Sequence, residues 1–296
     1  MILLTGSSGF LGKYLINNLP EKKVKTLGRS ACDYDVDLSL NVPCFKDKFE
    51  IVIHNAGKAH SIPNTNFQKQ EFYQVNVVGT QNLLAGIAKN CFPKYFVFVS
   101  SVSVYGLYCG IEINENTSLG AEDPYGKSKI VAEQIILDWC KKNNVICTIL
   151  RLPLLLGSNP PGNLNSMING IRKGFYFNLS GGTARKSMVL ASDVAKFILK
   201  AAEVGGIYNL TDGYHPSFCE LGKLIARQCG RKFVPNMPFY LAKFFAITGD
   251  MLGSKFLINS DKLTKITSTL TFDDSKARGA FGWNPSPVLK GFNIHE

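Results

Sequence analysis

The chain has 296 residues, 45% of them hydrophobic, and a formal net charge of +11 at pH 7. Such a chain can bury the core of one large α/β domain with a smaller appended part. Its cationic residues are scattered rather than interleaved with aromatics, which argues against nucleic-acid binding and suits a site for multiply charged anions.

No apolar stretch approaches the roughly 20 residues that cross a bilayer, and Met1 leads straight into a strand without a signal peptide. We therefore expect a cytoplasmic protein with no integral membrane segment. The eight cysteines include no CxxC pair and no metal-ligand spacing, so we expect reduced thiols and no metal site.

A strand, a glycine turn and a helix open the chain. Residues 1–5 form an apolar run, and the glycines of TGSSGFLG then lead into a helix over 10–19. Free backbone amides and the helix dipole at such a helix N-terminus favour a pyrophosphate. The GxxGxxG spacing also occurs in ordinary turns, so its place directly after a strand is what indicates a dinucleotide. The residues assigned to this site are Gly6, Ser8, Gly9, Phe10, Leu11 and Gly12.

A second strand over 23–28 bears on the choice between the two nicotinamide dinucleotides. A protein that prefers NAD usually has a carboxylate after this strand to hold the ribose 2′-hydroxyl, whereas this chain has Gly28, Arg29 and Ser30. A guanidinium can hold a 2′-phosphate through two parallel hydrogen bonds. NADP(H) is therefore favoured, with NAD(H) as the alternative if Arg29 is only a solvated surface residue.

Strands and helices alternate along most of the chain, which predicts an α/β Rossmann fold with a doubly wound parallel sheet. We assign residues 1–155 to the NAD(P)-binding core, with a return near 186–212, and residues 156–296 mainly to a smaller C-terminal substrate-binding part. Further strands are expected at 50–54, 95–101, 145–151 and 206–210, and helices at 67–90, 124–143, 164–173, 192–203 and 217–229.

Ser101, Tyr125 and Lys129 form the predicted catalytic set. Tyr125 and Lys129 are four residues apart on a helix that Asp123 can cap, so their side chains share one face. A nearby ammonium is expected to lower the pKa of the phenol from about 10 into a working range for proton transfer. Ser101 ends a strand at the carboxyl edge of the sheet, where it can bond a substrate oxygen together with Tyr125. A Tyr–Lys pair of this spacing, taken by itself, is more often a surface pair. Here the pair follows the glycine turn and Ser101 in the chain, and this order indicates a catalytic role.

These motifs together resemble the extended short-chain dehydrogenase/reductase family, in particular its sugar-nucleotide epimerases, dehydratases and reductases. The resemblance implies a nicotinamide cofactor and a nucleotide-linked sugar substrate, and it allows a homodimer through the helices at 67–90 and 124–143. It rests on TGSSGFLG, IHNAG at 53–57, VNVVGT at 75–80, FVSSVSVYG at 98–106, PYGKSK at 124–129, LRLP at 150–153, RKSMVLASDVA at 185–195 and SKARGAFGWNPS at 275–286.

Further contacts follow from this resemblance. Those implied for the cofactor are Asp37 and Leu38 at the adenine, with Asn55, Ala56, Gly57, Asn76 and Pro153. Those implied for the substrate are Lys58, Ser103, Asn163, Leu164, Arg185 and Lys186, with His60 at the border of the sugar. The alternative for Arg185 and Lys186 is an exposed basic pair.

Departures from the family pattern narrow the reaction. The 4,6-dehydratases of this family carry an Asp-Glu pair after the position of Ser101, where this chain has Val102 and Ser103. Dehydration is therefore disfavoured, which leaves reduction or epimerisation at C4. Arg29 and a similarity to reductases of UDP-4-keto-6-deoxy-N-acetylhexosamines in surface-polysaccharide synthesis favour a 4-keto reductase. The alternatives are a 4-epimerase with tightly bound NAD and a non-catalytic dinucleotide-binding protein on the same fold.

Overall fold

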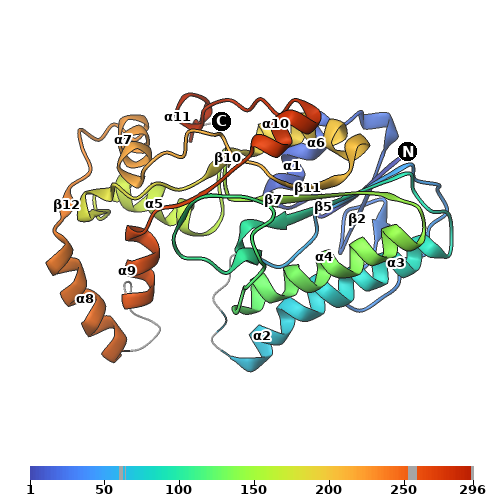
Figure 1. The fold of residues 1–296 in the computed structure, drawn as a ribbon, viewed down its shortest axis with the longest axis horizontal. Coiled ribbons are helices and arrows are strands. Elements are labelled where there is room, and N and C mark those ends of the chain that lie inside the picture. The colour runs from blue at the N-terminus through green and yellow to red at the C-terminus, as the bar shows by residue number, and fades with distance from the viewer. Residues whose placement is uncertain (60–62, 64, 253–258, 295–296) are drawn as a thin grey trace.

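The computed structural model describes residues 1–59, 63, 65–252 and 259–294, so His60 lies outside the described residues (Figure 1). Its centre is a parallel sheet of seven strands. From β1 the sheet extends one way through β2 and β3, and the other way through β4, β5, β7 and β11. This is the predicted doubly wound arrangement, with β3 as an additional edge strand. In order across the sheet the strands are β11 (Gly206–Asn209), β7 (Ile146–Leu152), β5 (Tyr95–Ser101), β4 (Ile51–His54), β1 (Ile2–Thr5), β2 (Val24–Gly28) and β3 (Tyr34–Asp35).

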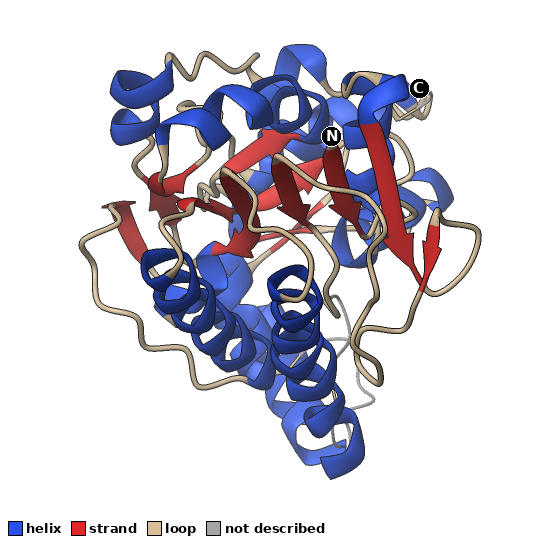
Figure 2. Ribbon diagram, turned by 90° about the vertical axis from the view of Figure 1, so that its right-hand side faces the viewer, coloured by secondary structure: helices blue, strands red, loops and turns tan. Residues whose placement is uncertain are grey.

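Helices cover both faces of the sheet, as Figures 1 and 2 show. The alternation of side chains along each strand builds the two hydrophobic layers. Along β1, Ile2 and Leu4 pack in the cluster that includes Leu15, whereas Leu3 belongs to the opposite cluster with Ile136. One layer consists of α1 (Phe10–Asn18), α6 (Ala191–Val204) and α10 (Ser275–Phe281), and the other of α2 (Asn66–Tyr73), α3 (Gly79–Ala88) and α4 (Pro124–Lys142).

The C-terminal part adds a separate cluster of buried residues to one end of the sheet, on the left of Figure 1. Three two-stranded parallel ladders lie outside the seven-stranded sheet, and most of their strands follow Arg151, where the sequence pattern loosens. The ladders pair β8 (Leu154–Leu156) with β10 (Met188–Leu190), β9 (Asn178–Leu179) with β12 (Asn236–Met237), and β6 (Gly110–Ile113) with β13 (Leu270–Phe272). The helices are α5 (Gly162–Lys173), α7 (Phe218–Gln228), α8 (Phe239–Leu252), α9 (Ser260–Thr267) and α11 (Val288–Gly291).

Within the described ranges, no helix has both the length and the apolar character needed to span a bilayer.

The sequence predicts one helix over 67–90, whereas the structure has two helices with an interruption between them. Between α2 and α3, residues Gln74–Val78 form a π-helical turn that contains the buried Asn76. Such turns insert one extra residue into a helix and occur often at functional sites. The interruption directs the Asn76 amide onto the polypeptide after β4, a contact that uniform helical periodicity could not reveal.

His54 at the end of β4 gives the fold a pH dependence. Its ring lies between the hydroxyls of Thr5 (2.8 Å) and Thr80 (2.9 Å), and burial, with the charge of Lys129, lowers its pKa to about 3. An unfolded chain binds this proton near pH 6.5, so protonation favours unfolding as the pH falls from 6.5 toward 3. We expect protonation at His54 to lower the free energy of unfolding over that range, by on the order of 4 kcal/mol at pH 3. Urea unfolding at pH 7 and pH 5 should show a smaller pH dependence in His54→Asn; equal slopes in the two proteins would contradict this assignment.

Candidate active site

The glycine turn between β1 and α1 lies where the sheet order reverses, and its packing excludes larger side chains. A Cβ on Gly12 would lie 2.1 Å from the Gly6 carbonyl oxygen, and Gly6 itself has a φ of +70° against the backbone of Ala56. Helix α1 begins after Gly9 with no side-chain cap, so its first amides are free for an anion. These features fit a dinucleotide pyrophosphate. Of the other assigned residues, Ser8 is exposed, Phe10 is half-buried and Leu11 packs in the core.

The segment after β4 packs on this turn. The Asn55 amide donates to the Gly6 carbonyl at 3.0 Å, and the Ala56 amide donates to Thr5 Oγ1 at 3.0 Å. Gly57 follows at a tight position, because a Cβ there would lie 3.1 Å from Asn76 Oδ1 and 3.3 Å from Lys129 Nζ. The structure therefore brings the predicted residues 55–57 beside both the glycine turn and α4, the helix that carries Tyr125 and Lys129.

Asn76 joins three elements. Its amide accepts from the Lys58 amide at 2.7 Å and donates to the Lys58 carbonyl at 3.1 Å and to Ser128 Oγ at 2.8 Å. Each polar atom of this buried side chain thus has a partner, which fixes the 57–58 backbone relative to α4. In this structure Asn76 acts on the site through Lys58 and Ser128, as the anchor of a hydrogen-bonding path.

Ser101 and Tyr125 come together at the carboxyl edge of the sheet. Ser101 is the last residue of β5, and Tyr125 lies in the first turn of α4, where Asp123 accepts from the Tyr125 amide at 3.1 Å and Pro124 begins the helix. Burial raises the pKa of the Tyr125 phenol, opposed by its hydrogen bond with Ser101. The phenol is therefore protonated at neutral pH, which suits a proton donor.

Lys129 differs from the sequence-based expectation. Its ammonium donates to the Val99 carbonyl at 2.9 Å and lies 4.5 Å from the centre of the Phe98 ring. Burial lowers its pKa to about 8, opposed by the charge of Glu133. The net shift at Tyr125 is upward, because burial outweighs the hydrogen bond from Ser101. The predicted lowering of the Tyr125 pKa by Lys129 is thus absent in this structure.

The three residues expected at the adenosine half of the cofactor follow β2. Arg29 is exposed at the end of that strand. Leu38 is buried, and its carbonyl accepts from the Asn82 amide at 2.7 Å, while Asp37 accepts from the Ser39 backbone amide at 2.9 Å. These bonds hold the 37–39 turn against α3. Pro153, the remaining residue of the cofactor set, is half-buried between β7 and β8.

The residues expected at the substrate are more dispersed. Ser103 Oγ is buried with no hydrogen-bond partner among the described residues, as expected of a group that binds a ligand. Lys58 instead pairs with Glu71 at 3.2 Å. Asn163 is exposed and Leu164 is buried in the first turn of α5, whose N-terminus has no side-chain cap.

Arg185 and Lys186 lie in different surroundings although they are adjacent. The Arg185 guanidinium donates to the His215 carbonyl at 2.9 Å and lies over the Tyr214 ring, so it is held by the segment before α7. Lys186 is half-buried, and burial lowers its pKa to about 8. A bound anion would stabilise the Lys186 charge, whereas Arg185 is already engaged.

Sequence reasoning missed a buried polar network between α4 and β7. Glu133 of α4 forms a two-pronged ion pair with Arg151 of β7, at 2.7 and 3.2 Å, and also accepts from Ser100 at 2.5 Å. Arg151 donates further to the Tyr105 hydroxyl at 3.0 Å. The signal in the sequence was an arginine inside the apolar run ILRL, since such a charge is buried only when it is paired.

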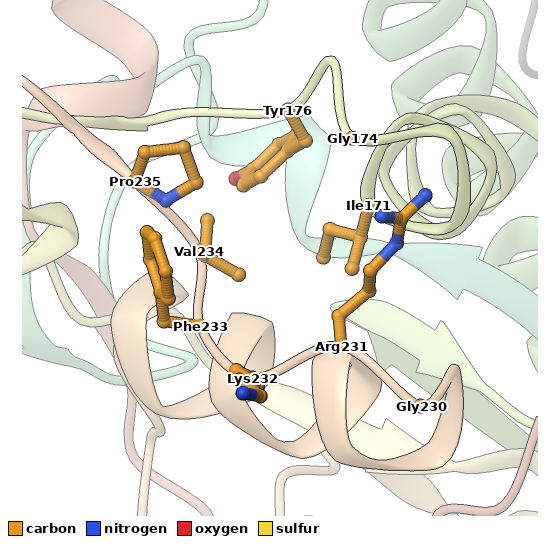
Figure 3. A pocket seen from close by; sticks show the side chains of 9 residues that line it. All are labelled: Ile171, Gly174, Tyr176, Gly230, Arg231, Lys232, Phe233, Val234 and Pro235. Carbon is orange, nitrogen blue, oxygen red and sulfur yellow. The ribbon is translucent and has the colours of Figure 1, made fainter.

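A cavity of about 370 Å³ lies away from these residues, between the end of α5 and the segment that leads from α7 to β12 (Figure 3). Ile171, Tyr176 and Val234 line it, with Arg231 and Lys232 at its edge. It shares no residue with the predicted site. Elsewhere within the described ranges, no group of three or more His, Cys, Asp or Glu side chains is arranged to hold a metal ion.

A Rossmann sheet with a glycine turn at its reversal point and a Ser–Tyr pair on the same edge is the architecture of a dinucleotide-dependent enzyme. The chain belongs to the NAD dependent epimerase/dehydratase family, whose model matches residues 2–211. It is therefore an enzyme of that family, and its cofactor is a nicotinamide dinucleotide.

Particular relatives span nearly the whole chain. The N-acetyl-alpha-D-glucosaminyl-diphospho-ditrans,octacis-undecaprenol 4-epimerase of Escherichia coli O157:H7 is 28% identical over 315 residues, covering 99% of this chain and 93% of the relative. The UDP-glucose 4-epimerase of Thermotoga maritima, solved with UDP-glucose, has a TM-score of 0.74 at 20% identity and covers 98% of this chain and 95% of that one. RMD from Pseudomonas aeruginosa, complexed with NADPH, has a TM-score of 0.70 at 22% identity, covering 98% and 96%. The two structural likenesses establish a shared fold.

Proposed function

We propose that this enzyme is an NADPH-dependent 4-keto reductase of a nucleotide-linked sugar. The observation that carries the proposal is the composition of the loop after β2. Arg29 is exposed there, while both nearby carboxylates have other partners: Asp33 accepts from the Thr26 amide of β2 at 2.9 Å and pairs with Lys25 at 2.8 Å, and Asp35 accepts from the Cys32 amide at 2.8 Å. A free guanidinium suits a 2′-phosphate, and NADPH is the exchangeable reductant that a net reduction needs.

Within this proposal, the chain's residues bind, orient and protonate. NADPH, when bound, supplies the hydride for C4 of the sugar. Ser101 orients the 4-keto oxygen, and Tyr125 donates its phenolic proton to that oxygen. Lys129, whose ammonium lies beside Gly57, would bind the cofactor ribose, and the uncapped first amides of α1 would hold the pyrophosphate. Lys186 and the N-terminus of α5 are suited to the substrate diphosphate, with the Ser103 hydroxyl available to the sugar.

The cofactor choice can be tested at one residue. Replacing Arg29 with Ala should raise KM for NADPH by about tenfold or more and leave KM for NADH nearly unchanged, because only NADPH carries the 2′-phosphate. Steady-state kinetics with both cofactors measure this, and Lys13→Ala on the exposed side of α1 is the control for a lost surface charge. An equal effect of Arg29→Ala on both cofactors would remove Arg29 from this role.

A second candidate is a 4-epimerase, which the names of the relatives favour. Both reactions need hydride transfer at C4 and the same Ser–Tyr proton path. The two are separated by stoichiometry: a reductase consumes one NADPH per product, whereas an epimerase interconverts sugars with no net consumption. Incubation with UDP-4-keto-6-deoxy sugars and NADPH, and separately with UDP-hexoses and no added cofactor, followed by product identification, decides between them. We also propose the homodimer and the cytoplasmic location that the sequence leads us to expect.

A further inference from the structure

Helix α8 carries its large apolar residues on the side that faces solvent. Tyr240, Phe244 and Ile247 are spaced i, i+4 and i+7, so they share one face of the helix. Their exposed fractions are 76%, 62% and 49%. Phe239 at the start of the helix is also about half exposed.

The opposite face of α8 is the one that packs, and it consists of small residues. Ala242 and Ala246 are fully buried, against Leu179 and Leu263. Gly249 continues the same stripe and is also buried. A helix that only had to cover its own domain would place the aromatic side chains inward, because they gain most from leaving water. Exposed apolar faces of this kind mark an interaction surface.

The polypeptide that leads into α8 adds cations and one more exposed aromatic. Arg231, Lys232 and Phe233 precede β12 (Figure 3), and Phe233 is exposed by 72%. The Arg231 guanidinium donates to the Arg172 carbonyl at 2.6 Å, which brings the end of α5 to the same place. Between residues 230 and 250 the sequence has three cationic residues and one acidic one, Asp250, whose carboxylate accepts from the Ser260 amide at 3.1 Å.

We propose that this face, formed by Lys232, Phe233, Tyr240, Lys243, Phe244 and Ile247, docks the enzyme on the surface of an anionic phospholipid bilayer. Aromatic and aliphatic side chains enter the interface between headgroups and acyl chains, and lysines bind anionic headgroups. Helix α8 lies at the end of the molecule remote from β2 and the N-terminus (Figure 1), so contact there leaves the Rossmann core in water.

The charges favour a bilayer over a second copy of this chain. In a twofold dimer the same patch meets itself, which would bring lysines of the two copies together, while Asp250, the carboxylate of α8, is already engaged by the Ser260 amide and hydroxyl. An anionic surface neutralises those charges instead. The docking proposal does not depend on which C4 reaction the enzyme catalyses.

The test is cosedimentation of the full-length enzyme with phosphatidylcholine vesicles that contain or lack phosphatidylglycerol. We expect binding to the vesicles with phosphatidylglycerol, weakened by salt, and little binding to phosphatidylcholine alone. The double variant Tyr240→Ser/Phe244→Ser should bind about tenfold more weakly, and so should Lys232→Gln/Lys243→Gln. All four side chains are exposed, so we expect the melting temperature of each variant to match that of the unaltered enzyme.

Matched controls change similar residues elsewhere. Leu40→Ser/Val204→Ser removes two other exposed apolar side chains, and Lys22→Gln/Lys89→Gln removes two other exposed charges. Both controls should keep vesicle binding. Absence of binding by the unaltered enzyme, or equal losses in the α8 variants and the controls, would overturn the proposal. A change from dimer to monomer in the Tyr240→Ser/Phe244→Ser variant, seen by analytical ultracentrifugation without a change in vesicle binding, would overturn it in favour of a contact between copies.

Discussion

Tyr125→Phe is expected to lower kcat by about 10²–10⁴-fold, the range typical of a positioned proton donor. The change removes only the hydroxyl that hydrogen-bonds with Ser101, so the helix start capped by Asp123 and the glycine turn should remain intact. NADPH affinity, measured by fluorescence titration, should therefore be unchanged while turnover of a keto-sugar nucleotide is lost.

Two controls accompany the Tyr125 prediction. Tyr73→Phe changes an exposed tyrosine of α2 in the same way and should leave kcat unchanged. Ser101→Ala should lower kcat less than Tyr125→Phe, because Ser101 orients the oxygen without donating the proton. Turnover by Tyr125→Phe at the rate of the unaltered enzyme would exclude Tyr125 as the donor. Loss of NADPH binding would instead show that the residue has a structural role.

Glu133→Gln is expected to lower the free energy of unfolding by about 3–5 kcal/mol. The change leaves the Arg151 guanidinium buried without its counter-charge, and an arginine cannot release its proton to compensate. Urea denaturation at pH 7 measures the effect. The double variant Glu133→Leu/Arg151→Met should recover most of the loss, since replacing both partners of a buried pair by apolar residues leaves no charge unpaired. A loss below 1 kcal/mol in the single variant would show that water reaches this network.

The Glu133→Gln variant should also lose activity at a lower pH than the unaltered enzyme does. Glu133 raises the pKa of Lys129 and so opposes the lowering by burial. Without that charge the Lys129 pKa falls below about 8, so a smaller fraction of the Lys129 side chain is protonated at neutral pH. The alkaline limb of the pH–rate profile should move to lower pH, an effect that loss of stability alone would not produce.

Much of the fold could be predicted from the sequence because its signals are local. The glycine turn, the Asp123–Pro124 helix start and the apolar strand runs each depend on residues close together in the chain, and the structure confirms the strands and the helices around them. The sequence also predicted Ser101 and Tyr125 as partners, and in the structure Ser101 acts on the pKa of the Tyr125 phenol. Their catalytic roles stay a prediction.

The rest depends on contacts between distant parts of the chain. The π-helical turn at Gln74–Val78 exists together with the bonds of Asn76 to Lys58 and Ser128, which lie 18 and 52 residues away. The Arg151–Glu133 pair joins a strand to a helix, so neither residue alone indicates the network. The pKa of the Tyr125 phenol is likewise raised rather than lowered, because burial dominates there, while Lys129 donates to the Val99 carbonyl.

The amino-acid sequence by itself determined the class of fold and the place of the glycine turn, since these follow from backbone sterics and short-range periodicity, and the order of its motifs indicated the family by resemblance. Only the tertiary structure decided which charges are buried in pairs and which side of α8 faces water. It also decided that the acidic residues near Arg29 have other hydrogen-bond partners. The physical reason is that burial sets the energy of a charge or an aromatic ring, and burial is a property of the assembled molecule.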